Sequence, residues 1–176
     1  MNVVFDLDGT LALHHHRRHF IEGENKDWRS YFDTCDEDKP NMPIVNILHE
    51  LCRPRNRRHH VEIWTGRSEG KDMVWREKTV QWLLTQADIF APGWPNLFEE
   101  EDLGNERLLD VMDLKMRPYK DYRSDVDLKR QWLCDQAETN YYPALVFEDR
   151  QKVVDMYRSY GITCVQVAPN SNSKIR

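Results

Sequence analysis

Two carboxylates, Asp6 and Asp8, stand two residues apart between an apolar run and a Gly-Thr turn, in the stretch VVFDLDGTLA. Where a strand ends, this spacing can place both side chains toward one pocket. A carboxylate can attack an electrophile and form a covalent acyl-phosphate, and a second carboxyl group, held protonated, can give a proton to the leaving oxygen. Because Asp normally titrates near about 3.9, burial and neighbouring carboxylates would have to raise the pKa of Asp8 for this second task.

A second acidic group lies near the end of the chain, where Glu148 and Asp149 follow the apolar run ALVF. If this run is a strand that ends beside Asp6, three carboxylates meet and repel one another unless a cation lies between them. A hard, oxygen-preferring ion such as Mg²⁺ suits such a site, and it would also offset the repulsion between Asp6 and an incoming phosphate. The acidic residues therefore favour a phosphate substrate and a divalent cofactor.

Groups that could bind the phosphate lie between these two acidic stretches. Thr65 and the backbone amides around Gly66 can donate hydrogen bonds to phosphoryl oxygens. Arg67 and Lys129 can supply positive charge where the charge of the transition state spreads over those oxygens. Phosphate monoesters are among the slowest compounds to hydrolyse unaided, so a site with several charged groups is expected.

Alternating strand and helix patterns would position these groups. Residues 13–39 are polar, aromatic and acidic without a clear period, and we interpret them as a long loop or a small flap, which in a compact domain is usually functional. The alternation predicts one α/β domain over residues 1–176, with a parallel sheet and helices on both faces. Ligands of such sheets bind at the carboxyl ends of the strands. The expected strands are 2–6, 60–64, 108–112, 144–148 and 163–168, and the expected helices are 42–53, 71–86, 125–138 and 150–160.

Four motifs occur in a fixed order: DLDGT (6–10), WTGR (64–67), a single Lys129, and FED (147–149) after an apolar strand. Together they resemble the haloacid dehalogenase superfamily of phosphatases. This resemblance implies a Rossmannoid three-layer fold in which residues 13–39 form a small flap or cap insertion. It also implies a phosphatase that depends on Mg²⁺.

The same resemblance implies a role for each residue that matches a motif. Asp6 would be the nucleophile, Asp8 the general acid and base, Thr65 a phosphate ligand and Lys129 the residue that stabilises charge. Magnesium would be held by Asp6, by the backbone carbonyl of Asp8 and by Asp149. Glu148 stands where the superfamily usually has Asp, and its longer side chain leaves open whether it binds the metal.

Further features resemble the phosphatase domain of phage polynucleotide kinase-phosphatases. The stretch LVFEDRQKVVDMYRSYGITCVQVA is similar to the end of that domain. Arg17 lies eleven residues after Asp6, Arg67 follows the second strand, and Asp125 lies four residues before Lys129. The resemblance implies a 3′-phosphatase that acts on nucleic-acid ends or on nucleotides, with a substrate-binding set made of Arg17, Gly66, Arg67 and Asp125.

Several alternatives stay open at the level of sequence. Arg18 could replace Arg17, and Lys115 or Lys120 could replace Lys129. A nucleoside 5′-monophosphate phosphatase is the second function, and a non-catalytic module that binds phosphate or a protein is the third. No G-x-x-x-x-G-K-[ST] motif occurs in the sequence, so the chain lacks the kinase P-loop, and end repair would require a separate kinase or ligase.

The composition limits the possible partners. With 40% hydrophobic and 31% charged residues, the 176-residue chain is typical of a globular protein, and it has no apolar stretch near the roughly 20 residues that span a bilayer. The absence of a signal-peptide pattern predicts a cytoplasmic protein without a membrane partner. A net charge of −5 argues against bulk electrostatic binding of nucleic acid. Trp28 and Tyr31 in the flap are the aromatic candidates for stacking on a base.

Overall fold

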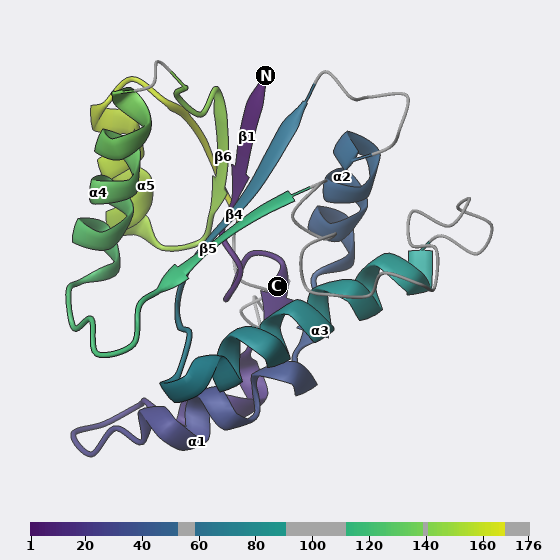
Figure 1. The fold of residues 1–176 in the computed structure, drawn as a ribbon, viewed down its shortest axis with the longest axis vertical. Coiled ribbons are helices and arrows are strands. Elements are labelled where there is room, and N and C mark those ends of the chain that lie inside the picture. Colours follow the sequence, from purple (N-terminus) through teal and green to yellow (C-terminus); the bar gives the residue numbers. More distant parts are fainter. Residues whose placement is uncertain (53–58, 91–111, 139–140, 168–176) are drawn as a thin grey trace, which may run out of the picture.

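The computed structural model describes residues 1–52, 59–90, 112–138 and 141–167, and its central feature is a parallel five-stranded sheet (Figure 1). The strand order is β5-β4-β1-β6-β7, and each neighbouring pair is parallel. This arrangement confirms the α/β fold class, with the first strand of the chain at the centre of the sheet. The strands are β1 (Asn2–Phe5), β4 (His60–Ser68), β5 (Met112–Arg117), β6 (Leu145–Glu148) and β7 (Thr163–Gln166).

Helices cover both faces of the sheet, which gives the three layers expected (Figure 1). Val3 and Phe5 of β1 belong to the core cluster that contains residues of α2 and α3, whereas Val4 belongs to the cluster that contains residues of α4 and α5. Successive side chains of a strand point to opposite faces, so a strand covered on both faces must be apolar throughout. The helices are α2 (Met42–Cys52), α3 (Val74–Phe90), α4 (Asp125–Ala137) and α5 (Gln151–Ser159).

Residues 13–39 form a small folded flap rather than an irregular loop. Its ends are joined by an antiparallel pair in which Ala12 faces Pro40, so the flap begins and ends at one place beside the sheet. The interior is built from short helical turns without a long amphipathic period, and for this reason no clear hydrophobic pattern is visible in residues 13–39. The flap elements are β2 (Ala12–Leu13), the 3₁₀ helix η1 (His15–Phe20), α1 (Trp28–Asp33), the 3₁₀ helix η2 (Cys35–Glu37) and β3 (Lys39–Pro40).

The predicted end of the second strand was wrong. Strand β4 continues to Ser68, and its register against β5 shifts between Thr65 and Ser68. Gly66 and Arg67 therefore lie within a bulge of the strand instead of beyond it. A bulge bends a strand and redirects its side chains, and this one lies at the carboxyl edge of the sheet.

Two other boundaries also differ from the prediction. Strand β5 begins at Met112, where the predicted strand 108–112 ends, and residues 108–111 lie outside the described part of the chain. The apolar run LLDVM predicted a strand four residues too early, and β5 is an edge strand of the described sheet in which alternate residues such as Leu114 and Met116 are buried. The predicted helix 71–86 differs at both ends, because α3 starts at Val74 after a 3₁₀ turn and reaches Phe90.

The described part of the chain contains no helix with both the length and the hydrophobicity needed to cross a bilayer. The four cysteines are free thiols, and no two of them form a CxxC motif.

Candidate active site

A tight turn after β1 presents Asp6 and Asp8 at the carboxyl edge of the sheet. The Asp6 amide donates to the Phe147 carbonyl at 2.9 Å, which fixes the turn to β6, and the Leu7 carbonyl accepts from the Ala12 amide at 2.8 Å. Gly9 has a positive φ of 99°, and a Cβ atom there would overlap the Asp149 carboxylate. The glycine of the DLDGT motif therefore serves two purposes, because it allows the turn and lets Asp149 approach the backbone.

Lys129 joins two acidic residues that are far apart in the sequence. Its Nζ atom lies 2.6 Å from Asp6 Oδ1 and 2.6 Å from Glu148 Oε2. Lys129 is 1% exposed and Glu148 is fully buried, so this charge network is largely removed from solvent. Burial alone would lower the pKa of Lys129, but the attraction of Asp6 and Glu148 outweighs it and raises the pKa. Lys129 is therefore a permanent cation beside the predicted nucleophile.

The carboxylates of Asp6, Glu148 and Asp149 lie close enough to share one cation, with an oxygen of each within 4.8 Å of the others. Burial, followed by the charges of Asp6 and Glu148, raises the pKa of Asp149 to about 9. Asp6 Oδ2 and Asp149 Oδ1 are buried and have no hydrogen-bond partner among the described residues. Unsatisfied carboxylate oxygens of this kind are the ligands that Mg²⁺ prefers, so the residues present fit a magnesium ion.

Glu148 differs from the other two acidic residues because both of its oxygens are engaged. Oε2 accepts from Lys129, and Oε1 accepts from the Arg150 backbone amide at 3.0 Å. This geometry favours Asp6 and Asp149 as metal ligands and gives Glu148 the task of holding Lys129. The Glu148 side chain, which is one methylene longer than Asp, thus reaches Lys129 and does not leave a free oxygen for a metal.

A second network surrounds Asp8 and contains two buried arginines. Arg17 Nη2 and Arg67 Nη2 each lie 2.5 Å from Asp8 Oδ1. The two arginines are 0% and 1% exposed, and they come from the flap and from the bulge of β4. The structure therefore brings together Asp8, Arg17 and Arg67, as the predicted substrate-binding set requires.

The expected rise in the pKa of Asp8 was wrong for the free protein. Burial would raise the pKa, but the attraction of Arg67 and then of Arg17 outweighs burial and lowers it. The main charges that act on Asp8 are those of Arg67, Arg17 and His14, all of which lower its pKa, rather than those of neighbouring carboxylates. Asp8 is therefore ionised until another anion draws the arginines away.

Asp38 is a functional residue that the sequence analysis missed. Arg17 Nε donates to Asp38 Oδ1 at 2.7 Å, and Arg67 Nη2 donates to Asp38 Oδ2 at 2.9 Å. Its side chain is completely buried, and the Trp82 indole donates to its backbone carbonyl at 2.7 Å. No motif marks this residue, since its importance comes only from the two arginines that fold against it. Asp38 fixes both guanidinium groups beside Asp8.

Tyr31 supports the same network from the flap, and so it cannot be the base-stacking residue that the sequence suggested. Its ring lies 4.1 Å from the Arg17 guanidinium carbon, and the residue is only 4% exposed. A buried cation over an aromatic face is stabilised electrostatically. Trp28, the other aromatic candidate, is 45% exposed and packs edge-on against Tyr31.

Thr65, Gly66 and Asp125 meet at the bulge of β4. Thr65 is fully buried, and its Oγ1 atom accepts from the Arg67 amide at 3.1 Å. A Cβ atom at Gly66 would overlap the Asp125 carboxylate, so only glycine lets the two segments approach. In the described part of the chain, the ion pairs of Asp125 are with Arg117 and Arg150; it pairs with neither Arg17, Arg67 nor Lys129.

The rival residues lie elsewhere. Lys115 pairs with the buried Glu62 at 3.2 Å, and Arg18 pairs with Glu22 at 3.2 Å on the exposed side of the flap. Lys120 is exposed in the connection between β5 and α4. Position alone therefore favours Lys129 and Arg17 for the roles predicted from the sequence.

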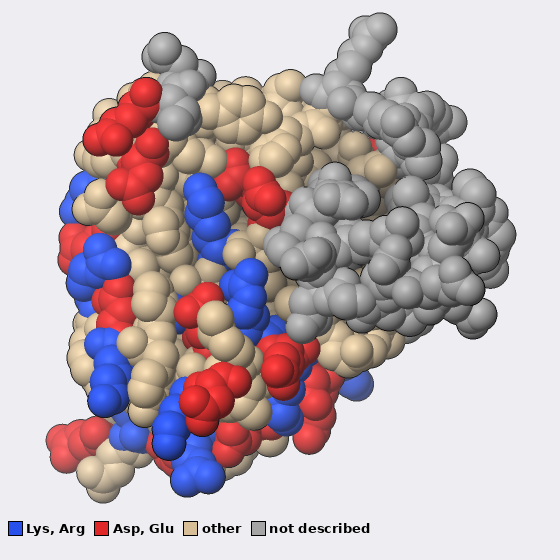
Figure 2. All heavy atoms as spheres, in the orientation of Figure 1, with Lys and Arg blue, Asp and Glu red and all other residues tan. Residues whose placement is uncertain are grey.

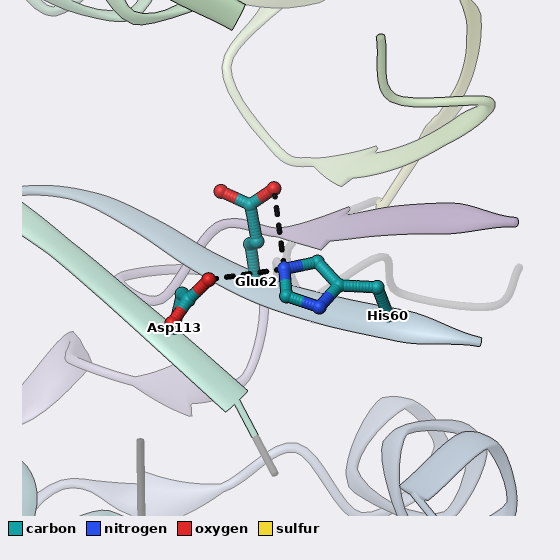
Figure 3. Close-up of side chains that lie close together, drawn as sticks. All are labelled: His60, Glu62 and Asp113. Atoms are coloured by element: carbon teal, nitrogen blue, oxygen red, sulfur yellow. Dashed lines mark ion pairs between the residues drawn. The ribbon is translucent and has the colours of Figure 1, made fainter. Parts of the chain in front are cut away.

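A second group of potential metal ligands, His60, Glu62 and Asp113, lies at the opposite end of the sheet (Figure 3). His60 Nε2 is 3.0 Å from Asp113 Oδ2. However, the buried Glu62 carboxylate already accepts from Trp64 at 2.8 Å and pairs with the Lys115 ammonium. Since Lys115 supplies the positive charge that a metal would bring, we interpret this group as a satisfied structural carboxylate.

The fold and this edge of the sheet define a haloacid dehalogenase-type phosphatase. The family model for the polynucleotide kinase PNKP phosphatase domain matches the sequence over residues 1–102 and 96–171, and the chain belongs to that family. No curated protein matches the chain by sequence.

Two solved structures have the same fold at low sequence identity. A chain of the Pnkp1/Rnl/Hen1 RNA repair complex superposes with a TM-score of 0.62 and 26% identity, over 95% of this chain and 42% of its own length. A second structure of the Pnkp1/Rnl/Hen1 complex gives a TM-score of 0.62 and 25% identity, over 95% of this chain and 45% of its own. The chain thus spans less than half the length of these relatives.

Replacing Asp38 tests whether it holds the two arginines. We expect Asp38→Ala to lower the free energy of unfolding by about 3 kcal/mol or more, because it leaves two buried cations with too few partners, and Asp38→Asn to lose less. Asp36→Ala is the matched control, since Asp36 is an exposed flap carboxylate paired with Lys78, and such pairs contribute up to about 1 kcal/mol. Urea denaturation measures all three, and equal losses for Asp36→Ala and Asp38→Ala would contradict the assignment.

The raised pKa of Asp149 predicts how the stability of the metal-free protein changes with pH. In the folded chain, Asp149 keeps its proton up to its raised pKa of about 9. In the unfolded chain, it releases the proton near the ordinary Asp pKa of about 3.9. The contribution of Asp149 to the free energy of unfolding therefore falls as pH rises between these two values. In EDTA, the melting temperature of Asp149→Asn minus that of the wild type should therefore increase from pH 5 to pH 9. Magnesium should raise the melting temperature of the wild type and not of the variant. A difference in melting temperature that does not change with pH in EDTA would show that the pKa of Asp149 is not raised in the folded protein.

Proposed function

We propose that this phosphatase is a magnesium-dependent phosphomonoesterase that works through an aspartyl-phosphate on Asp6 and releases phosphate from 3′-phosphorylated nucleic-acid ends or nucleotides. The observation that carries the mechanism is the state of Asp6. One of its oxygens is bound by Lys129 at 2.6 Å, and the other is buried without a hydrogen-bond partner in the described part of the chain. A nucleophilic carboxylate must be oriented and must keep an oxygen that no protein group occupies, and the Asp6 carboxylate meets both requirements among the described residues.

In the first step, one oxygen of the Asp6 carboxylate attacks the phosphorus atom and the bond from phosphorus to the ester oxygen breaks, while the other oxygen stays available to a cation. Asp8 gives a proton to the departing alcohol, whose oxygen carries the electron pair of the broken bond. In the second step, Asp8 takes a proton from water, the water oxygen attacks the phosphorus, and inorganic phosphate leaves as the Asp6 carboxylate is restored. Splitting one difficult displacement into two steps is the general benefit of covalent catalysis.

Asp8 must carry a proton for the first step, although Arg17 and Arg67 hold it ionised in the free protein. A bound phosphate offers the two guanidinium groups a second anionic acceptor, and planar guanidinium groups bind phosphate well. Each hydrogen bond transferred from Asp8 to the phosphate raises the pKa of Asp8. We propose that substrate binding and protonation of the general acid are coupled in this way.

The remaining residues neutralise charge. Lys129 and Arg67 stabilise the developing charge on the phosphoryl oxygens, and Thr65 with the amide of Gly66 donates hydrogen bonds to them. Asp6, the backbone carbonyl of Asp8 and Asp149 would hold Mg²⁺, which supplies charge neutralisation between Asp6 and the phosphate. Asp125 supports the phosphate site indirectly through its contact with Gly66.

A nucleic-acid substrate is supported by the family and by the RNA repair complex among the structural relatives. In that complex the related chain occurs together with Rnl and Hen1, and we propose that this protein likewise acts beside a separate ligase or kinase. A nucleoside 5′-monophosphate phosphatase is the second candidate, because the site residues alone do not select the position of the phosphate.

Asp6→Asn tests the nucleophile. We expect turnover to fall by at least about 10³-fold, because the amide cannot form the covalent intermediate, while the circular dichroism spectrum is unchanged. A phosphorylated wild-type protein, trapped by rapid acid quench and absent from the variant, would identify the intermediate directly. Unchanged turnover in the variant would exclude Asp6 as the nucleophile.

A matched substrate pair tests the position of the phosphate. We expect phosphate release with Mg²⁺ from an oligonucleotide that bears a 3′-phosphate, and at least about tenfold slower release from the same oligonucleotide with a 5′-phosphate, a difference of about 1.4 kcal/mol in the transition state. The 3′- and 5′-mononucleotides are measured beside them. Preference for the 5′-phosphates would move the protein to the second candidate function.

A further inference from the structure

The connection between β5 and α4, residues 118–124, exposes two tyrosines beside the active site. Tyr122 is 90% exposed and Tyr119 is 47% exposed. Lys120 and Arg123 are exposed in the same connection, and the Lys120 ammonium lies 5.5 Å from the Tyr119 ring. A nearly fully exposed aromatic ring in a segment that also exposes two cations, with the sequence YKDYR, has the character of a surface that binds a nucleic-acid strand.

Hydrogen bonds fix the conformation of this 118–124 loop. Arg117, at the end of β5, donates to the carbonyl of Arg123 at 2.6 Å and to that of Asp121 at 3.4 Å. The Arg123 guanidinium pairs with the Asp121 carboxylate at 2.5 Å, and the Asp121 amide donates to the Pro118 carbonyl at 3.1 Å. Because the loop is ordered before any ligand arrives, little conformational entropy is lost when Tyr122 makes a contact.

The same arginine attaches the loop to the phosphate site. Arg117 Nε donates to the Gly66 carbonyl at 2.9 Å, next to Thr65, and Asp125 at the end of the loop packs against Gly66. Asp125 also pairs with Arg150, whose backbone amide donates to Glu148. Figure 1 shows the loop beyond the carboxyl end of β5, at the edge of the sheet where the catalytic residues lie.

We propose that the 118–124 loop binds the nucleotides that precede the terminal phosphate, with Tyr122 stacked on a base and Lys120, Arg123 and Arg150 near the strand phosphates. This inference rests on the proposed function and adds to it the means by which a polynucleotide is distinguished from a small phosphate ester. The net charge is −5, and in Figure 2 acidic and basic side chains alternate over the lower part of the face shown. The net charge argues against bulk electrostatic binding of a strand, and a local stack beside a few cations is the arrangement that the charges on this face favour.

The test compares wild type, Tyr122→Ala and Tyr122→Phe on p-nitrophenyl phosphate and on a short single-stranded oligonucleotide with a 3′-phosphate. We expect Tyr122→Ala to raise KM for the oligonucleotide by about 5- to 150-fold, the loss typical of one base–aromatic stack. Its kinetics on p-nitrophenyl phosphate should be unchanged, and Tyr122→Phe should behave as wild type because a phenyl ring also stacks. Tyr142→Ala is the matched control, because Tyr142 is also an exposed tyrosine, at 51%, but lies at the opposite end of the sheet. Two residues after it, the Ala144 amide donates to the carbonyl of Asn2 at the start of β1.

A second measurement separates this inference from the proposed function. Fluorescence anisotropy gives the Kd of the labelled 3′-phosphorylated oligonucleotide for Asp6→Asn and for Asp6→Asn with Tyr122→Ala, independently of turnover. A rise in Kd with the tyrosine substitution supports the loop as the strand-binding surface, even if the wild type hydrolyses neither substrate and the proposed function fails. An equal Kd for the two proteins, or an effect of Tyr142→Ala as large as that of Tyr122→Ala, overturns the inference while leaving the phosphatase in place.

Discussion

The structure depends on the neutralisation of buried carboxylates at one edge of the sheet. Among the described residues, five acidic side chains around the Asp6–Asp8 turn are matched by three buried cations, so two carboxyl groups are left without a cation of their own; the ion pairs of Asp125 with Arg117 and Arg150 lie outside this group. Burying an unpaired charge is far more costly than burying a pair, and the raised pKa of Asp149, about 9, measures this shortage. One divalent ion held by Asp6 and Asp149, as proposed, would restore the balance and let the fold keep this much charge out of water. The acidic residues are Asp6, Asp8, Asp38, Glu148 and Asp149, and the cations are Arg17, Arg67 and Lys129.

Partners, rather than sequence position, give the two motif aspartates different properties. Asp6 shares a lysine with Glu148 and keeps one oxygen free, whereas Asp8 faces two arginines that lower its pKa. These arginines lie 9 and 59 residues from Asp8 along the chain. A sequence that places two carboxylates together suggests mutual repulsion and a raised pKa, but the folded chain supplies the opposite charge to one of them. Two side chains of the same type can thus perform the two halves of a displacement.

Much of this site could be predicted because its residues follow buried strands. Apolar runs that end at Asp6 and Glu148 mark where β1 and β6 stop, and parallel strands must bring those ends to one edge; β4 runs to the same edge but continues past Thr65 to Ser68. The bulge at Gly66 and the paired carboxylate of Asp38 could not be predicted, since neither has a local pattern: the first is a shift in register between two strands, and the second is an ordinary acidic residue in a polar segment. The predictions of a raised pKa for Asp8 and of a base-stacking role for Tyr31 were wrong because they too lacked a local pattern. Each depends on contacts between segments far apart in the sequence.

The sheet and the segments inserted into it supply different side chains to the site. In the proposed mechanism, the turn after β1 supplies Asp6 and Asp8, and α4 brings Lys129 to Asp6. The flap contributes Arg17 and Asp38, and the bulge of β4 contributes Arg67, so the charged groups around Asp8 come together only where flap and sheet meet. Opposite the flap contacts, Arg117 ties the 118–124 loop to Gly66. In the proposed mode of binding, the phosphate contacts the two arginines and the strand contacts Tyr122, and contacts of this kind outside the reacting centre give a site for phosphoryl transfer a preference for a particular alcohol.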